Sequence, residues 1–163
     1  MTLSDQLALV GVIVTVIGVI VALIGIGVAV WQMFRANRIA QVQSWLTLRD
    51  LMANYDDVHA NLRPAGKWHA SLEEPHIVEE WAKVETYMGL FEYCKELIDA
   101  GLLRKDEFKR WYLYRLSNLL ANPRIVTYKL HQRRGGWTDF IVLCEILEKE
   151  IPPSTKNLPS FVH

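Results

Sequence analysis

The chain has 163 residues, of which 18 are basic and 18 acidic, and 51% of its residues are hydrophobic. Its two cysteines, Cys94 and Cys144, lie far apart and lack the spacing of metal ligands. This composition excludes a disulfide-stabilised secreted scaffold. No histidine cluster has metal-ligand spacing and no glycine-rich loop precedes a helix, so we expect neither a metal nor another cofactor.

The first predicted element is a membrane-spanning helix. Residues 7–30 carry no charge, and Thr15 is the only conventional polar side chain among them. These 24 residues would form roughly 36 Å of helix, enough to cross a hydrocarbon core of about 30 Å. We therefore predict a transmembrane segment within residues 1–33 and a cytoplasmic part comprising residues 34–163.

Small residues recur regularly along this helix. Successive members are four, three, four, three and four positions apart: Gly11, Thr15, Gly18, Ala22, Gly25 and Ala29. This heptad spacing gives one narrow face on which neighbouring backbones can approach closely, with a left-handed crossing. We expect copies of the chain to associate through this face. The alternative is a plain anchor that needs no partner.

The flanks of the segment predict its orientation. Asp5 is the only ionisable side chain before it, whereas Arg35 and Arg38 follow it closely. Because cytoplasmic flanks are enriched in Lys and Arg, we expect the amino terminus outside and the bulk of the chain in the cytoplasm. The first residues contain no Lys or Arg and the apolar run is long, so we expect the segment to be retained rather than cleaved.

The rest of the chain has helical periodicity throughout, which predicts an all-α bundle. Apolar residues from Ile39 to Leu62 recur every three or four positions, so the membrane helix should run on until Arg63-Pro64. Four further helices are expected: one ending at Gly101, one capped by Asp106, one from Asn122-Pro123 to Gly135-Gly136, and one capped by Thr138 that ends before Pro152. In the tail, Leu158, Phe161 and Val162 could dock on a neighbouring surface.

The charges are unevenly distributed. Residues 50–99 contain eleven acidic and four basic side chains, whereas residues 104–134 contain nine basic and two acidic ones. Six of these cations form a candidate patch for an anion or a partner: Arg104, Lys105, Lys109, Arg110, Arg133 and Arg134. Four aromatic residues lie among the cations: Trp111, Tyr112, Tyr114 and Tyr128. Three interpretations stay open: helices of opposite charge facing each other in one domain, subunits mating head to tail in a ring, or binding of RNA or anionic headgroups.

The only pattern that suggests catalysis is Arg124 and His131 in the segment PRIVTYKLH. Seven residues are close to two helical turns, so both side chains would share a face. Arg could hold a phosphate while His acts as acid or base on a ribose hydroxyl. The structural alternative is that His131 serves as a favourable cation at a helix C-terminus.

Taken together, the single span, the helical cytoplasmic part and the Arg124/His131 pair resemble the accessory membrane proteins of type VI-B CRISPR systems. The segment LFEYCKELIDAGLLRKDEF, residues 90–108, is also similar to a broader family of small single-pass bacterial membrane proteins. The resemblance implies a ring in the bacterial inner membrane that makes the membrane permeable and strengthens RNA-guided antiphage immunity. It also implies that Arg124 and His131 occupy the positions of the HEPN ribonuclease motif, in which Ile125 stands where a polar residue is usual.

Three functional hypotheses follow. The leading one is a cyclic homo-oligomer that forms a poorly selective pore and has an RNA-guided CRISPR effector or RNA as a possible partner; no DNA binding is expected. The second is a membrane-tethered ribonuclease that uses Arg124 and His131. The third is a scaffold that recruits a cytoplasmic partner to the membrane. An enzymatic role is the less favoured class.

Overall fold

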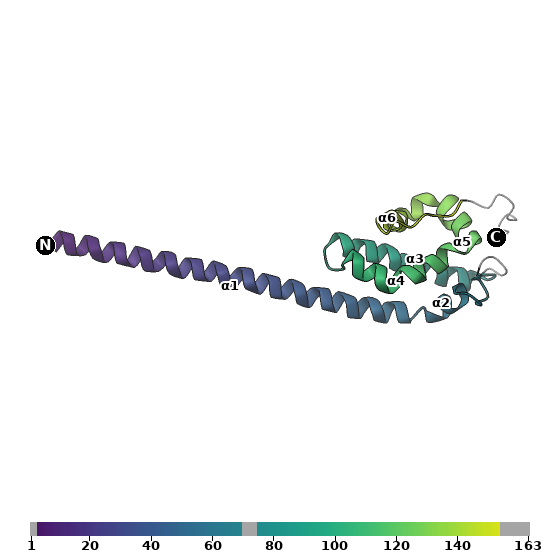
Figure 1. The fold of residues 1–163 in the computed structure, drawn as a ribbon, viewed down its shortest axis with the longest axis horizontal. Helices are drawn as coiled ribbons and strands as arrows, with labels where there is room; N and C mark the ends of the chain where they lie inside the picture. The colour runs from purple at the N-terminus through teal and green to yellow at the C-terminus, as the bar shows by residue number, and fades with distance from the viewer. Residues whose placement is uncertain (1–2, 70–74, 154–163) are drawn as a thin grey trace. The chain divides into compact units, whose positions relative to one another are not determined.

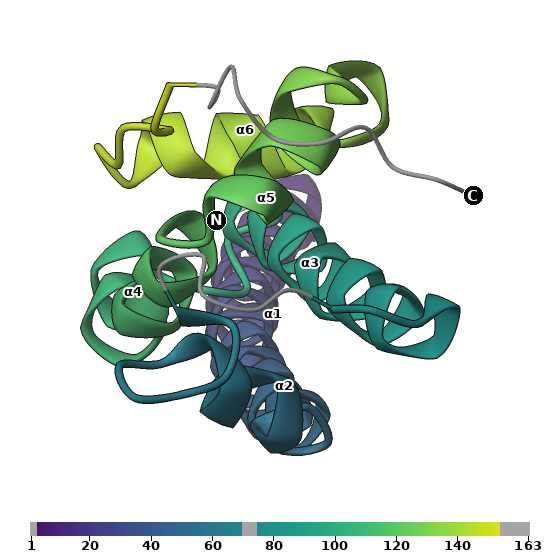
Figure 2. The same ribbon diagram turned by 90° about the vertical axis from the view of Figure 1, so that its right-hand side faces the viewer.

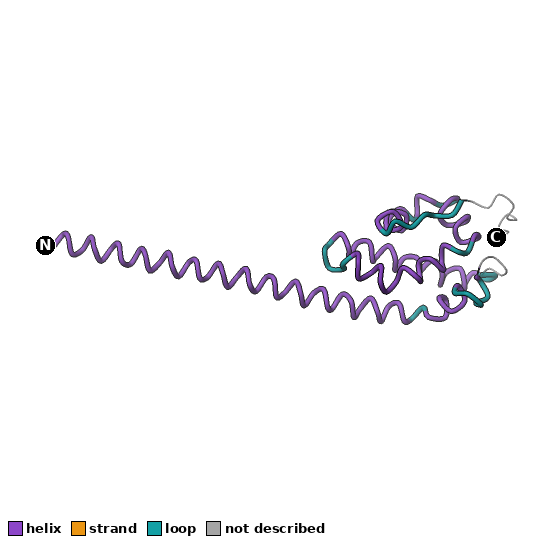
Figure 3. The backbone as a smooth tube through the Cα atoms, in the orientation of Figure 1, coloured by secondary structure: helices purple, strands orange, loops and turns teal. Residues whose placement is uncertain are grey.

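The computed structural model describes residues 3–69 and 75–153, without the side chains of residues 3–10, 12–14 and 16. Within these ranges the chain is all-helical and has no strand, which confirms the predicted fold class (Figures 1 and 3). The chain divides into two compact units, residues 1–40 and 41–163. The predicted docking of Leu158, Phe161 and Val162 falls outside the described residues.

The first helix ends earlier than the periodicity predicted. Helix α1 spans Leu3–Ala53, and the short helix α2 spans Asp56–Leu62. Between them the Tyr55 amide donates to the carbonyl of Met52 at 3.3 Å, a tighter turn than the α-helical pattern. The expected single helix up to Arg63 is therefore interrupted at residues 54–55, although α2 does end just before Arg63-Pro64.

The next two helices are α3, Val78–Asp99, and α4, Lys105–Leu120. The prediction that Gly101 ends α3 is confirmed, because it adopts a φ of 69° directly after the C-cap. The predicted N-cap of α4 was wrong: Arg104 occupies that position without a side-chain hydrogen bond. Asp106 lies instead in the first turn, where its negative charge complements the helix dipole.

The remaining segment contains α5, Pro123–Ile125, the π-helix η2, Val126–His131, the short 3-10 helix η3, Arg134–Gly136, and α6, Thr138–Ile146. Asn122 caps α5 as predicted, since its side chain accepts hydrogen bonds from the amides of Arg124 and Ile125. The predicted cap of α6 was wrong, because Trp137 holds the N-cap position and Thr138 is the first helical residue.

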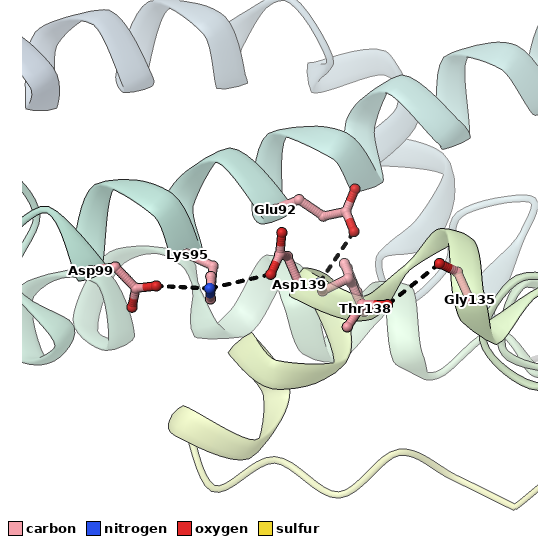
Figure 4. A network of polar contacts seen from close by, with 7 residues as sticks. Glu92, Lys95, Asp99, Gly135, Thr138 and Asp139 are labelled. Atoms are coloured by element: carbon pink, nitrogen blue, oxygen red, sulfur yellow. Dashed lines mark hydrogen bonds and ion pairs between the residues drawn. The ribbon is translucent and has the colours of Figure 1, made fainter.

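The core of the second unit is built from large side chains contributed by several helices. The Phe91 ring of α3 meets Phe108 of α4 at 6.4 Å and Phe140 of α6 at 5.9 Å, both edge to face. Helix α6 packs across α3 (Figure 2). Polar contacts also join the two helices: Lys95 of α3 pairs with Asp139 of α6, and Glu92 accepts from the Phe140 amide. Lys95 pairs in addition with Asp99 on its own helix (Figure 4).

Candidate functional site

The described residues contain one helix that is long and apolar enough, by length and composition, to cross a membrane. It lies within Ile17–Ala53. Large apolar side chains from Ile17 to Val30 are all between 43% and 63% exposed within the single chain. Such a continuous apolar exterior is typical of a helix that faces lipid or other helices rather than water.

The small-residue face of this helix is open along its length. All six of its members are exposed: Gly11, Thr15, Gly18, Ala22, Gly25 and Ala29. A Cβ atom added at any of the three glycines would meet nothing within 4 Å. The Thr15 hydroxyl donates to the Gly11 carbonyl oxygen at 2.9 Å, so this polar group needs no partner outside the helix.

The last turns of α1 are tied to the bundle by contacts that the sequence did not reveal. The Gln41 side chain donates to the Gly101 carbonyl at 3.0 Å, and the Trp45 indole N–H donates to Glu107 at 3.0 Å. The Trp45 ring also stacks on Tyr112, with centroids 6.1 Å apart. Trp45 was predicted only as one member of an apolar stripe, because periodicity does not show which residue has a polar partner.

A second anchor lies at the end of the same helix. Arg115 of α4 donates to the carbonyl of Met52, at 3.3 Å, and to the carboxylate of Asp56, at 2.6 Å. The first contact gives a carbonyl in the last turn of α1 a second donor, beside the Tyr55 amide. Arg115 therefore holds the junction between α1 and α2 against the bundle.

The Arg124 and His131 pair lies in a segment that is not a regular α-helix. From Val126 to His131 the backbone is π-helical, and the Gln132 amide donates to the Thr127 carbonyl at 3.0 Å. A π-helix turns less per residue than an α-helix, so the two-turn argument for a shared face does not apply to this segment. His131 is exposed, its Nε2 lies 2.9 Å from the Pro152 carbonyl oxygen, and Arg124 is half-buried.

The predicted basic patch is partly neutralised within the chain. Lys105 and Lys109 both pair with Glu148, at 3.3 and 3.7 Å, and Arg104 pairs with Glu107 at 3.7 Å. Glu148 was not counted in the charge analysis because it follows the basic segment. The other three members, Arg110, Arg133 and Arg134, are exposed.

The aromatic residues among these cations divide into two groups. Tyr112 and Tyr128 are buried, whereas Trp111 and Tyr114 are 67% and 57% exposed. Ion pairs between the acidic and the basic segment also exist inside the chain: Arg115 pairs with Asp56, and Lys129 pairs with Glu85. Part of the charge asymmetry is thus used within the bundle.

Among the described residues, no group of three or more His, Cys, Asp or Glu side chains could hold a metal ion. Comparison with known proteins found no matching family, no matching curated protein and no matching solved structure. The site is therefore interpreted from the residues and geometry of the chain itself.

Proposed function

We propose that this chain is a single-pass inner-membrane protein whose copies assemble through the small-residue face of α1 and form a poorly selective pore. The observation that carries the proposal is a charge-free helix segment with an open ridge of Gly, Ala and Thr in heptad spacing. In lipid the hydrophobic effect does not drive helices together, so close backbone packing along small residues is a main source of association.

The chemistry of the segment suggests how such a pore would behave. No side chain between residues 7 and 30 is charged, so the span supplies no ring of charge that could select one ion over another. Walls of Val, Ile and Leu would close by dewetting. Contacts of Gln41, Trp45 and Arg115 at the end of α1 would carry a change in the bundle to this helix.

The assembly is tested by placing larger side chains on the small-residue face of α1. Gly18→Leu combined with Gly25→Leu should reduce the mass of the detergent-solubilised particle to that of a smaller species, because leucine side chains keep the backbones apart. Gly27→Leu is the matched control: it is also an open glycine, but two residues from Gly25 it points to nearly the opposite side of the helix. An unchanged particle mass in the double variant, or an equal loss of mass in the control, contradicts assembly through the small-residue face.

The pore itself is tested by recording from planar bilayers that contain the purified protein. We expect conductance with little preference between potassium and chloride, measured as a reversal potential near zero in a salt gradient. The double variant Gly18→Leu with Gly25→Leu should lose this conductance. A bilayer that stays tight in every condition, including in the presence of a cytoplasmic partner, rules out the pore and leaves the ribonuclease and scaffold roles.

The part that the protein plays in a cell is a separate proposal. A role in RNA-guided antiphage defence rests on the resemblance of the sequence to the type VI-B accessory membrane proteins alone. It predicts that co-expression of the chain with an RNA-guided effector lowers phage plaque numbers only when the small-residue face is intact. Equal protection by the wild type and by the Gly18→Leu/Gly25→Leu double variant would separate any defence role from assembly in the membrane.

A further inference from the structure

A pocket lies between the first turns of α3 and the π-helix η2. Its volume is about 200 Å³, and it is lined by Val78, Trp81, Glu85, Tyr128, Lys129, Gln132 and Arg133. Trp81 and Tyr128 are buried and meet edge to face, with ring centroids 6.1 Å apart. Gln132 and Arg133 are exposed. The pocket therefore combines an aromatic wall with polar groups facing the solvent.

A buried lysine is the most unusual feature of this pocket. Lys129 is only 7% exposed, it is ion-paired with Glu85, and its ammonium lies 4.8 Å from the centre of the Trp81 ring. Burying the charge of a lysine is costly even when a carboxylate pairs with it. The lysine also sits in a π-helix, a backbone form that is rare and is often found at functional sites.

The two members of this ion pair differ in their exposure to solvent. The Glu85 side chain is 41% exposed, whereas that of Lys129 is 9% exposed. The carboxylate can therefore turn into water while the ammonium stays inside the pocket. An incoming anion that takes the place of Glu85 would meet Lys129 at once, with Arg133 at the entrance as a second cation.

We propose that this pocket binds a nucleotide, whether or not the chain forms a pore. A phosphate would replace the Glu85 carboxylate on Lys129 and contact Arg133. The base would lie against those atoms of Trp81 and Tyr128 that line the pocket, in van der Waals contact with their rings. The Gln132 amide can both donate to and accept from the edge of a base. The volume suits one base, with the sugar toward the open side.

The test is calorimetric titration of the full chain in detergent with AMP, adenosine, inorganic phosphate and a short single-stranded RNA. We expect AMP to bind more tightly than either adenosine or phosphate, since each of those engages half of the pocket. Lys129→Met should weaken AMP binding about tenfold or more, the range for a lost charge-assisted hydrogen bond. Lys83→Met is the matched control: it breaks the exposed ion pair with Asp57, lies outside the pocket, and should bind as the wild type does.

Two further variants separate loss of binding from loss of folding. Glu85→Gln removes the competing carboxylate and should tighten AMP binding several-fold, a gain that a damaged fold does not produce. Arg133→Gln, at an exposed position, should weaken binding several-fold. If RNA binds and AMP does not, with the same dependence on Lys129, the nucleotide unit belongs to an RNA strand and the proposal stands.

Three results overturn the proposal. The first is the absence of binding for AMP and RNA alike. The second is wild-type affinity in the Lys129→Met protein. The third is inorganic phosphate binding as tightly as AMP, which would mean that the aromatic wall contributes nothing.

Discussion

At the scale of single residues, His59 in α2 is a half-buried titratable group whose charge the fold disfavours. Its Nδ1 is buried without a hydrogen-bond partner among the described residues, and its ring packs edge-on against Tyr114 at 5.8 Å. Burial lowers the pKa of His59 below its usual 6.5, and the nearby Arg115 lowers it further, while Asp56 acts in the opposite direction. The folded chain therefore prefers the neutral imidazole.

This preference predicts a loss of stability in mild acid. The unfolded chain takes up a proton near pH 6.5 and the folded chain does so only at lower pH, so stability is complete above about 6.5 and falls as the pH decreases toward the folded pKa. Thermal unfolding of the wild type should move to lower temperature between pH 7.5 and 5.5. His59→Gln should show a smaller shift, because the difference between the two proteins isolates this one group. Equal shifts would mean that His59 titrates normally.

Asn122 makes hydrogen bonds to two separate parts of the fold. It is fully buried, its Nδ2 donates to the Trp68 carbonyl at 2.6 Å, and its Oδ1 accepts from two amides of α5 at 3.0 Å. The sequence motif Asn-Pro predicted the cap, but it could not predict the bond to Trp68, which lies 54 residues away in the chain.

Asn122→Ala should therefore cost more than the loss of an ordinary helix cap. A cap is worth about 1 kcal/mol, and leaving a buried carbonyl without its donor costs about 1–3 kcal/mol more, so we expect a loss of roughly 2–4 kcal/mol. Urea unfolding of the detergent-solubilised chain, followed by tryptophan fluorescence, measures it. Asn54→Ala, at an exposed position, should change stability by less than about 0.5 kcal/mol. Equal effects of the two changes would refute the double role of Asn122.

At the scale of helices, periodicity identified most elements but missed the break in α1. Met52, Val58 and Leu62 are buried on both sides of the break, so the apolar spacing continues through it without a change of phase. No Gly or Pro marks residues 54–55. The turn arises because α2 packs its apolar side on the same core, which is a tertiary effect that a local pattern does not contain.

The π-helix was missed for a related reason. Five successive residues, Val126 to Leu130, are buried, so this segment has no exposed side from which a period could be read. When every side of a helix is buried, its sequence has no hydrophobic periodicity from which the number of residues per turn could be inferred. The pocket that contains Lys129 was therefore beyond sequence reasoning, because the pairing with Glu85 joins two distant helices.

Two helices end in the same backbone motif with different residues at the critical position. After α3 the amide of Leu102 donates to Leu97 and that of Gly101 to Ile98, at 2.9 and 3.0 Å. After α6 the amide of Lys149 donates to Cys144, and the corresponding C′ residue is Glu148 with a φ of 57°. This Schellman arrangement needs a left-handed residue, which glycine adopts without steric cost.

We predict that substitutions at the left-handed residues of these two helix ends change the stability of the chain in opposite directions. Gly101→Ala should lower stability by about 1 kcal/mol through the backbone alone, because its Cβ would meet nothing within 4 Å. Glu148→Gly should leave stability unchanged or raise it, since it relieves the left-handed conformation and removes only solvent-exposed ion pairs to Lys105 and Lys109. Urea unfolding of both variants provides the comparison. A loss of equal size in both would show that backbone conformation does not decide these helix ends.

At the scale of the whole molecule, the sequence alone was enough to predict the features that depend on the residue pattern of a single helix. The charge-free run and the spacing of its small residues lie within 30 consecutive residues and need no tertiary information. The anchors of α1 to the bundle are different, because Gln41 meets Gly101 and Trp45 meets Glu107 only after folding. A prediction of how the bundle could act on the candidate membrane-spanning segment thus requires the structure.

The predicted orientation can be measured because the native thiols are hidden. Cys94 and Cys144 are fully buried, and burial raises the pKa of Cys144 to about 12 and that of Cys94 further still, so neither presents a reactive thiolate at neutral pH. Cysteines placed at Ser4 and Asn37, on either side of the apolar run, would then dominate labelling of intact cells by a membrane-impermeant maleimide.

Ser4→Cys should react from outside, and Asn37→Cys only after the membrane is permeabilised, because Arg35 and Arg38 favour the cytoplasmic side for the second flank. The wild type should stay unlabelled until it is unfolded, which shows that the introduced thiols are the ones detected. The reverse pattern would place the helical bundle outside the cytoplasm. It would also remove any cytoplasmic partner from consideration, since the bundle and the surfaces of Trp111 and Arg133 would then face the other compartment.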